Sequence, residues 1–278
     1  MLSGDYGGEI KMRNYKGELV REVKGHSEIV WALCSHASLI FSGSPDETIN
    51  IWEASSLTCK ATLQGHTGEV LSLCMGNGLL YSGSCDDAIR AWDIAEGKCL
   101  GVLEGHADDV NAVAFSDGLL FSGSDDETVR VWDPRTQRRE CTLTGHTGRV
   151  WSLCFAQGAL CSGSGDCSIK LWDPRAHACL RTLTGHAETV SGLCARQGML
   201  YSGSFDKTAR AWSVADGICR TTLEGHADWV NAACSFGGRV CSGSDDKTIK
   251  VWDVSAGSCR TWQGRRAAVY ALCAALPA

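Results

Sequence analysis

Short runs of alternating apolar and polar residues cover most of this chain, and turns rich in Gly, Ser and Asp separate them. In the segment CSIKLWD (167–173), Ile169 and Leu171 share one face, and Lys170 and Trp172 share the other. A period of two residues is typical of β-strands, whose successive side chains point to opposite faces. The pattern therefore predicts an all-β protein built from short strands and tight turns.

The strand pattern recurs with a period of 40 residues, which we call a unit. Gly-His begins at positions 25, 65, 105, 145, 185 and 225. The motif Ser-Gly-Ser-x-Asp and then a Trp follow at fixed distances, with the residues Asp46, Asp86, Asp126, Asp166, Asp206 and Asp246 and Trp52, Trp92, Trp132, Trp172, Trp212 and Trp252. Each copy is read as four short strands, so the sequence predicts an array of similar sheets.

The order and spacing of these motifs resemble the WD-repeat β-propeller family, and the resemblance covers essentially the whole chain. It implies that Ser162 accepts a hydrogen bond from the Trp172 N–H, that His146 bonds Ser162, and that Asp166 bonds His146. His, Ser and Asp in one stretch also suggest a catalytic triad. A triad is needed once, however, and six evenly spaced copies favour a structural role.

The end of the chain continues the repeat into its beginning. Residues 264–278 align with the first strand of a unit, and residues 1–24 align with the other three strands. We therefore expect one WD-repeat domain, residues 1–278, that forms a seven-bladed β-propeller of four-stranded antiparallel blades. Pairing of the N- and C-terminal segments would close the ring and remove exposed edges. One step, from Gly225 to Gly264, is 39 residues. The alternative that the chain was cut from a longer protein stays open.

The composite seventh blade departs from the motif. Arg265 occupies the His position, Gly7 the Asp position and Arg13 the Trp position. Its internal hydrogen bonds cannot form as in the other blades, so we expect this blade to be the least stable and the first to open.

Composition and charge narrow the classes of function. The net charge is −6 and no dense basic run occurs, which disfavours nucleic acid as a partner. No run approaches the roughly 18 apolar residues of a membrane span. The beginning, MLSGDYGGEIKM, lacks the apolar segment of a signal peptide. We expect an intracellular protein, cytoplasmic or nuclear.

The 16 cysteines follow the repeat, which is typical of cysteine used as a small core residue. Equivalent positions on neighbouring blades are expected to lie beyond the roughly 7 Å that a disulfide spans. No CxxC pair suggests a zinc site. We therefore expect reduced thiols, no metal and no cofactor, with the turn residues Cys85 and Cys167 as the most reactive thiols.

Function is expected where the copies differ. In the family, three positions per blade surround the mouth of the central channel, on the face that carries the tight turns. Aromatic residues at these positions gather over units four to seven and unit one, and acidic residues over units two and three. The predicted partner-binding residues are Trp31, Glu69, Asp109, Asp125, Arg149, Trp151, Phe205, Trp229 and Tyr270, with Tyr6 and Asp108 beside them. Leu71, Asn111, Ser191, Asn231 and Asp245 occupy equivalent positions and are not chosen. The alternative is that some of these aromatic residues only fill the channel or pack under loops.

The segment WDPR occurs twice, ending at Arg135 and Arg175. With the strand before it, it resembles the motif by which some WD-repeat proteins dock on the adaptor of a cullin–RING ubiquitin ligase. The same sequence is also a common propeller turn that Pro stiffens.

These observations favour a non-catalytic protein–protein interaction scaffold that binds a peptide or protein segment on the channel-mouth face. One alternative is a substrate receptor of a cullin–RING ubiquitin ligase. Another is a propeller enzyme, which would need an unrepeated cluster of polar residues in the channel. The sequence shows no convincing one, and we expect His36 and His177, outside the motifs, to lie in loops apart from any acidic or nucleophilic group. We expect no catalytic residues, a protein or peptide partner, no nucleic acid or membrane partner, and a monomeric domain within a larger complex.

Overall fold

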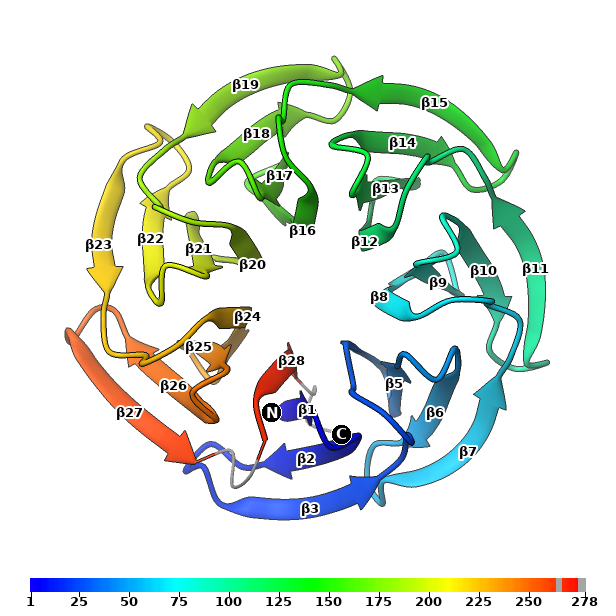
Figure 1. Ribbon diagram of the computed structural model, residues 1–278, viewed down its shortest axis with the longest axis horizontal. Helices are drawn as coiled ribbons and strands as arrows, with labels where there is room; N and C mark the ends of the chain where they lie inside the picture. Colours follow the sequence, from blue (N-terminus) through cyan, green and yellow to red (C-terminus); the bar gives the residue numbers. More distant parts are fainter. Residues whose placement is uncertain (264–266, 275–278) are drawn as a thin grey trace.

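The computed structural model describes residues 1–263 and 267–274, which form seven four-stranded antiparallel sheets arranged in a ring (Figure 1). Blade 1 consists of β4 (Ala32–His36), β5 (Leu39–Gly43), β6 (Ile49–Glu53) and β7 (Thr58–Leu63), from the centre outwards. The next two blades are β8 (Val70–Gly76), β9 (Leu79–Ser84), β10 (Ile89–Asp93) and β11 (Lys98–Leu103), followed by β12 (Val110–Ser116), β13 (Leu119–Ser124), β14 (Val129–Asp133) and β15 (Arg138–Leu143).

Blades 4 and 5 are β16 (Val150–Ala156), β17 (Ala159–Ser164), β18 (Ile169–Asp173) and β19 (Ala178–Leu183), followed by β20 (Val190–Arg196), β21 (Met199–Ser204), β22 (Ala209–Ser213) and β23 (Cys219–Leu223). Blade 6 contains β24 (Val230–Phe236), β25 (Arg239–Ser244), β26 (Thr248–Asp253) and β27 (Ser258–Gln263). Blade 7 contains β28 (Val269–Cys273), β1 (Leu2–Asp5), β2 (Glu9–Arg13) and β3 (Leu19–Lys24). The predicted fold class, an all-β seven-bladed propeller, is confirmed.

The ring is closed by pairing between the two ends of the chain. In blade 7, β28 lies beside β1 and pairs with it antiparallel, with Leu2 opposite Cys273 and Gly4 opposite Ala271 (Figure 1). The inner strand therefore comes from the end of the sequence and the other three from its beginning, as predicted. Arg265, which the sequence places at the His position of this blade, lies outside the described residues.

The hydrophobic core lies between the blades, where each sheet packs on the next. Trp52 of blade 1, for example, is 2% exposed and shares a cluster with Leu2 and Ile10 of blade 7. The tryptophans at the same position in blades 2 to 6 are also buried, each at the interface with the preceding blade. Burying so large a side chain contributes several kcal/mol, about 3–5 by truncation to Ala, so the Trp of each unit joins neighbouring blades.

The hydrogen bonds that the family resemblance implied are confirmed. Trp172 Nε1 donates to Ser162 Oγ at 2.8 Å, His146 Nε2 lies 2.7 Å from that oxygen, and His146 Nδ1 lies 2.7 Å from Asp166 Oδ2. The carboxylate can only accept, so Nδ1 carries the proton, and Nε2 of the neutral ring accepts from the serine hydroxyl. The same arrangement occurs in blades 1, 2, 3, 5 and 6.

Blade 7 replaces this arrangement with a different one. Arg13 Nη1 donates to Ser3 Oγ at 2.9 Å, which is the bond that Trp makes elsewhere. The Asp5 carboxylate accepts from the Gly7 amide at 2.9 Å and pairs with the ammonium group of Lys11. Lys11 and Asp5 are each 3% exposed at the side chain. The repeat bonds are indeed absent from the described part of this blade, but a buried ion pair takes their place.

A second adjustment occurs between blades 6 and 7. Trp262 in β27 occupies the position that Leu223 holds in blade 5, and it packs against Met1. In blades 1 to 5 the two outer strands shift register just before the Trp of the motif, and between β26 and β27 no shift occurs at Trp252. A bulge adds one residue to a strand, so its absence here accounts for the 39-residue step in the sequence.

All sixteen cysteines lie within the described residues and are free thiols. The sequence comparison considered only neighbouring blades, yet Cys154 stands directly opposite Cys161 within blade 4. Their mutual hydrogen bond and burial raise the pKa of Cys154 well above its ordinary value. Burial and a bond to Asp109 raise the pKa of Cys85, and burial raises that of Cys167. The thiolate is therefore disfavoured at both turn cysteines, which weighs against their being the most reactive thiols.

Candidate functional site

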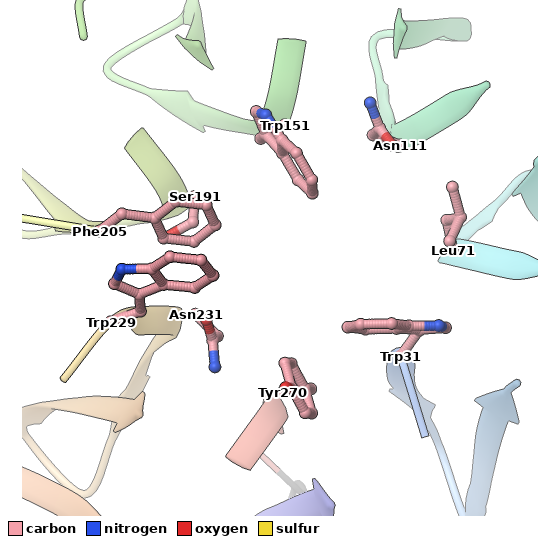
Figure 2. A pocket seen from close by; sticks show the side chains of 9 residues that line it. All are labelled: Trp31, Leu71, Asn111, Trp151, Ser191, Phe205, Trp229, Asn231 and Tyr270. Atoms are coloured by element: carbon pink, nitrogen blue, oxygen red, sulfur yellow. The ribbon is translucent and has the colours of Figure 1, made fainter. Parts of the chain in front are cut away.

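A pocket of about 300 Å³ opens at one mouth of the central channel (Figure 2). Seven of its lining residues come from the same position of the repeat, one per blade, at or just before the inner strand, and two more come from turns above. The lining residues are Trp31, Leu71, Asn111, Trp151, Ser191, Asn231 and Tyr270 at the repeated position, and Phe205 and Trp229 in the turns. The channel below is lined by the inner strands of all seven blades.

The predicted aromatic residues meet in two clusters around this pocket. In the first, which we call the Phe205 cluster, the Phe205 ring stacks on Trp229 at 4.4 Å between centroids and meets Trp151 edge-on at 5.9 Å. In the second, the Tyr270 ring meets Trp31 edge-on at 4.6 Å and lies 6.5 Å from Tyr6. Trp229 is 45% exposed and Tyr6 is 61% exposed, so both clusters present apolar surface to solvent.

Asn231 lies between the two clusters in Figure 2, so the aromatic arc expected from the sequence is interrupted. Five of the nine predicted partner-binding residues line the pocket, namely Trp31, Trp151, Phe205, Trp229 and Tyr270. The prediction did not choose the uncharged lining residues Leu71, Asn111, Ser191 and Asn231. These four residues occupy the same position of the repeat as Trp31, and this equivalence could have identified them.

The predicted charged residues do not line the pocket, and two of them, Glu69 and Asp125, bond to its lining. Glu69 accepts a hydrogen bond from Trp31 Nε1 at 3.1 Å. Asp125 accepts one from Asn111 Nδ2 at 2.6 Å and pairs with the Arg149 guanidinium at 2.9 Å. Glu69 and Asp125 therefore position an aromatic and an amide group of the pocket wall instead of forming it.

The acidic side of the mouth carries closely spaced carboxylates. The oxygens of Asp87, Asp108 and Asp109 lie within 4.8 Å of one another. Burial and the two carboxylates at 108 and 109 raise the pKa of Asp125, although Asn111 and Arg149 oppose the shift. On the other side of the pocket, burial and the neighbouring Asp245 carboxylate raise the pKa of Tyr270 to about 12. Carboxylates therefore lie on two sides of the pocket, at Asp125 and at Asp245.

The buried Ser-His-Asp sets have the geometry of a hydrolase triad but not its access. Ser162 is fully buried, and its oxygen already accepts from Trp172 while bonding His146. A nucleophile must reach a substrate carbonyl, and this oxygen is enclosed between two blades. The same holds for the serines at this position in blades 1, 2, 3, 5 and 6, all fully buried.

The two WDPR turns lie on the face opposite the pocket, because they connect the third and fourth strands of their blades. The side chains of Arg135 and Arg175 are each 84% exposed. Asp133 and Asp173 accept hydrogen bonds from the backbone amides of these arginines at 2.9 and 2.8 Å, which holds both turns in the same conformation.

The ring of Trp-centred blades defines the class of protein as a repeat-built β-propeller, and comparison with known proteins identifies the family. The family model described as "WD domain, G-beta repeat" matches residues 17–53, 57–93, 97–133, 137–173, 177–213 and 217–253. The chain therefore belongs to the WD40 repeat family. WD40 propellers are general protein-interaction scaffolds and are typically non-catalytic.

Among solved structures, the chain is similar to the computationally designed Ika8 protein, with a TM-score of 0.80 and 33% sequence identity. The match covers 98% of this chain and 86% of the designed one. No curated protein sequence matched the chain. Within the described residues, no helix has the length and apolar character that crossing a membrane requires.

Proposed function

We propose that this protein is a non-catalytic interaction scaffold that binds a peptide or protein segment on the channel-mouth face. The observation that carries the proposal is the preformed pocket of about 300 Å³, with five aromatic side chains held at the inner strands and in the turns above them. Large aromatic residues in concave sites are the usual anchors of protein recognition. A rigid site also loses little conformational entropy when it binds, which favours affinity.

The kind of partner follows from the chemistry of this face. The mouth carries several carboxylates and only one guanidinium, Arg149, among its predicted charged residues. This charge favours a protein or peptide partner over nucleic acid or an anionic membrane surface. We further propose that the domain acts as a monomer within a larger complex, in the cytoplasm or the nucleus.

The experiment is affinity capture from native extract with the wild-type chain and with the triple variant Trp151→Ala, Phe205→Ala, Trp229→Ala. A matched control removes three exposed apolar side chains away from the mouth, in the variant Tyr15→Ala, Leu180→Ala, Ile218→Ala. We expect a captured protein to disappear with the mouth variant and to remain with the control. Equal capture by all three folded proteins would overturn the proposal.

A second candidate function is that of a substrate receptor of a cullin–RING ubiquitin ligase. The supporting observation is that Arg135 and Arg175 project from equivalent turns of adjacent blades, fully clear of the pocket face. The pocket would then hold the substrate and the arginines would contact the adaptor. The variant Arg135→Ala, Arg175→Ala should lose a co-purified cullin adaptor, whereas Arg21→Ala, Arg260→Ala, at exposed positions elsewhere, should retain it. No observation on the described residues supports the alternative that the protein is a propeller enzyme.

A further inference from the structure

Most side-chain hydrogen-bond donors of the pocket already bond to other groups of the protein. Asn231 Nδ2 donates to Asp245 Oδ1 at 2.7 Å and to the Val269 carbonyl at 3.3 Å. Asn111 Nδ2 donates in the same way to Asp125 and to the Val150 carbonyl. An amide nitrogen has two hydrogens, so neither asparagine has a donor left for a ligand. Each still has its carbonyl oxygen, which accepts.

Three other polar groups of the pocket also make hydrogen bonds inside the protein. Trp31 Nε1 donates to Glu69, the Ser191 hydroxyl donates to the Val230 carbonyl, and the Tyr270 hydroxyl bonds Asp245. Figure 2 shows the six-membered rings of Trp151 and Trp229 nearer the middle of the pocket than their indole nitrogens. Apart from these two indole N–H groups, the lining side chains therefore offer a ligand acceptor oxygens and aromatic faces.

The charge of the mouth is also that of a site for a hydrogen-bond donor or a cation. Of the residues at the mouth positions of all seven blades, four are acidic (Glu69, Asp109, Asp125 and Asp245) and one is basic (Arg149). Asp125 bonds the lining residue Asn111 and Asp245 bonds the lining residue Asn231, so a positive charge entering the pocket would have a carboxylate on either side. The face of an indole ring attracts cations by its quadrupole.

We infer that this pocket receives the cationic side chain, Lys or Arg, of a basic partner segment. The inference rests on the proposed function and specifies the chemistry of the partner. The aromatic faces of the Phe205 cluster and of Trp31 contact the side chain, and the carboxylates around them neutralise its charge. An acidic side chain would meet mainly acceptor oxygens and carboxylates, with Arg149 as the one basic residue at the mouth positions, and a neutral apolar one would gain no attraction from the carboxylates.

The test uses four soluble random peptide libraries with one fixed central residue, Lys, Arg, Leu or Glu, titrated against the intact protein. We expect the Lys or the Arg library to bind about tenfold more tightly than the Leu and Glu libraries, since a desolvated cation–π contact is worth about that factor. The preference should shrink between 50 mM and 500 mM salt, because solvent-accessible charges are screened. Acetylation of the fixed Lys should abolish it.

Two variants place the binding in the pocket. Trp229→Ala removes an aromatic face, and Asp245→Asn removes a carboxylate; each should weaken binding of the cationic library several-fold. Tyr15→Ala and Asp117→Asn make the same changes at exposed positions outside the mouth and should have no effect. A cationic preference that both pocket variants leave unchanged would overturn the inference.

The remaining outcomes separate this inference from the proposed function. If the Leu or the Glu library binds best and Trp229→Ala weakens that binding, the inference is wrong and the proposed function stands. If no library binds in a way that depends on Trp229, the inference is wrong and the proposed function loses its support as well.

Discussion

The Phe205 and Trp229 rings lie 4.4 Å apart and within 14° of parallel, although Phe205 follows the second strand of blade 5 and Trp229 precedes the first strand of blade 6. The stack joins two blades at the rim of the pocket. It shows how the repeat uses one element, an aromatic side chain, for two purposes. Tryptophan between blades holds the ring together, and tryptophan on the rim is available to a partner.

These two roles predict that replacing Trp by Ala lowers the stability of the protein by very different amounts. Trp212→Ala removes a buried side chain, 2% exposed, and should lower the free energy of unfolding by about 3–5 kcal/mol. Trp229→Ala removes a half-exposed ring and should cost about 1 kcal/mol or less, mostly from the lost stack. Urea unfolding measures both. Equal losses for the two variants would contradict the distinction.

We expect the buried serine of each repeat to stabilise its blade, because it bonds both the Trp and the His of the motif. Ser162→Ala leaves the Trp172 N–H and His146 Nε2 without their shared partner inside the core. An unsatisfied buried polar group costs about 1–3 kcal/mol, so we expect at least that loss in urea unfolding. Ser255→Ala, at an exposed turn, is the control and should be neutral. A neutral result for both would show that the serine bond does not stabilise the blade.

Stability should fall as the solution is acidified, in two steps. Burial lowers the pKa of His146 despite its bond to Asp166, so the unfolded chain takes up this proton first, and stability falls as pH drops below about 6.5. Burial opposes ionisation of Asp166, but bonds from Ser168 and His146 outweigh it and lower its pKa to about 2. That contribution is complete above about pH 4 and is lost as pH falls toward 2.

Urea unfolding between pH 8 and pH 3 measures this dependence. The histidine step should be shared by the blades of His106 and His226, whose pKa values burial also lowers. His146→Gln should reduce the change between pH 7 and pH 5, relative to wild type. Stability that stays constant over this interval would contradict the assignment of neutral, buried histidines.

Blade 7 should open before the other blades. Its described part lacks the His-Ser-Trp bonds and instead buries Lys11 against Asp5. Buried ion pairs contribute little net stability, because desolvation offsets most of the attraction. Native-state hydrogen exchange should show lower opening free energies for the amides of β1 and β2 than for those of β13 and β14. Asp5→Asn should lower them further, since it removes the buried partner of Lys11 and leaves only the partly exposed Glu9 and Glu22 beside its charge, whereas Glu9→Gln should have a small effect. Uniform exchange across the blades would contradict this prediction.

Arg149 should compete with a cationic ligand. Its guanidinium pairs with Asp125 at 2.9 Å and is 62% exposed. Arg149→Ala should therefore tighten binding of the Lys or Arg library by about two- to fivefold, while costing at most about 1 kcal/mol of stability, as is usual for exposed pairs. Arg138→Ala, an exposed arginine on an outer strand, is the control. Weaker binding by Arg149→Ala would indicate that this guanidinium contacts the partner itself.

Most of the fold could be predicted from the sequence, because the repeat makes each inference six times. A period of two within the strands and of 40 between the motifs determines strand content, blade order and the buried His-Ser-Asp-Trp bonds. Closure of the ring was also predictable, since residues 264–278 and 1–24 together complete one unit. The repeat also showed which positions surround the channel mouth, and five of the nine residues chosen there line the pocket.

The sequence could not show how the irregular parts compensate. Arg13 bonds the serine that Trp bonds elsewhere, which the departure from the motif did not reveal. Trp262 fills the space between blades 6 and 7, and Met1 reaches it only because the ring closes. The sequence shows that one repeat is 39 residues long, but only the strand register shows that a bulge is missing there.

The sequence alone thus determined the architecture and the ring of variable residues at its mouth, because these depend on local periodicity that every unit repeats. Only the tertiary structure decided what the mouth offers a ligand. Whether Asn231 presents a donor or an acceptor depends on Asp245 and Val269, which other strands bring to it. Hydrogen bonds between side chains far apart in the sequence are set by the packing of the blades, and they leave this pocket with aromatic faces and acceptor oxygens.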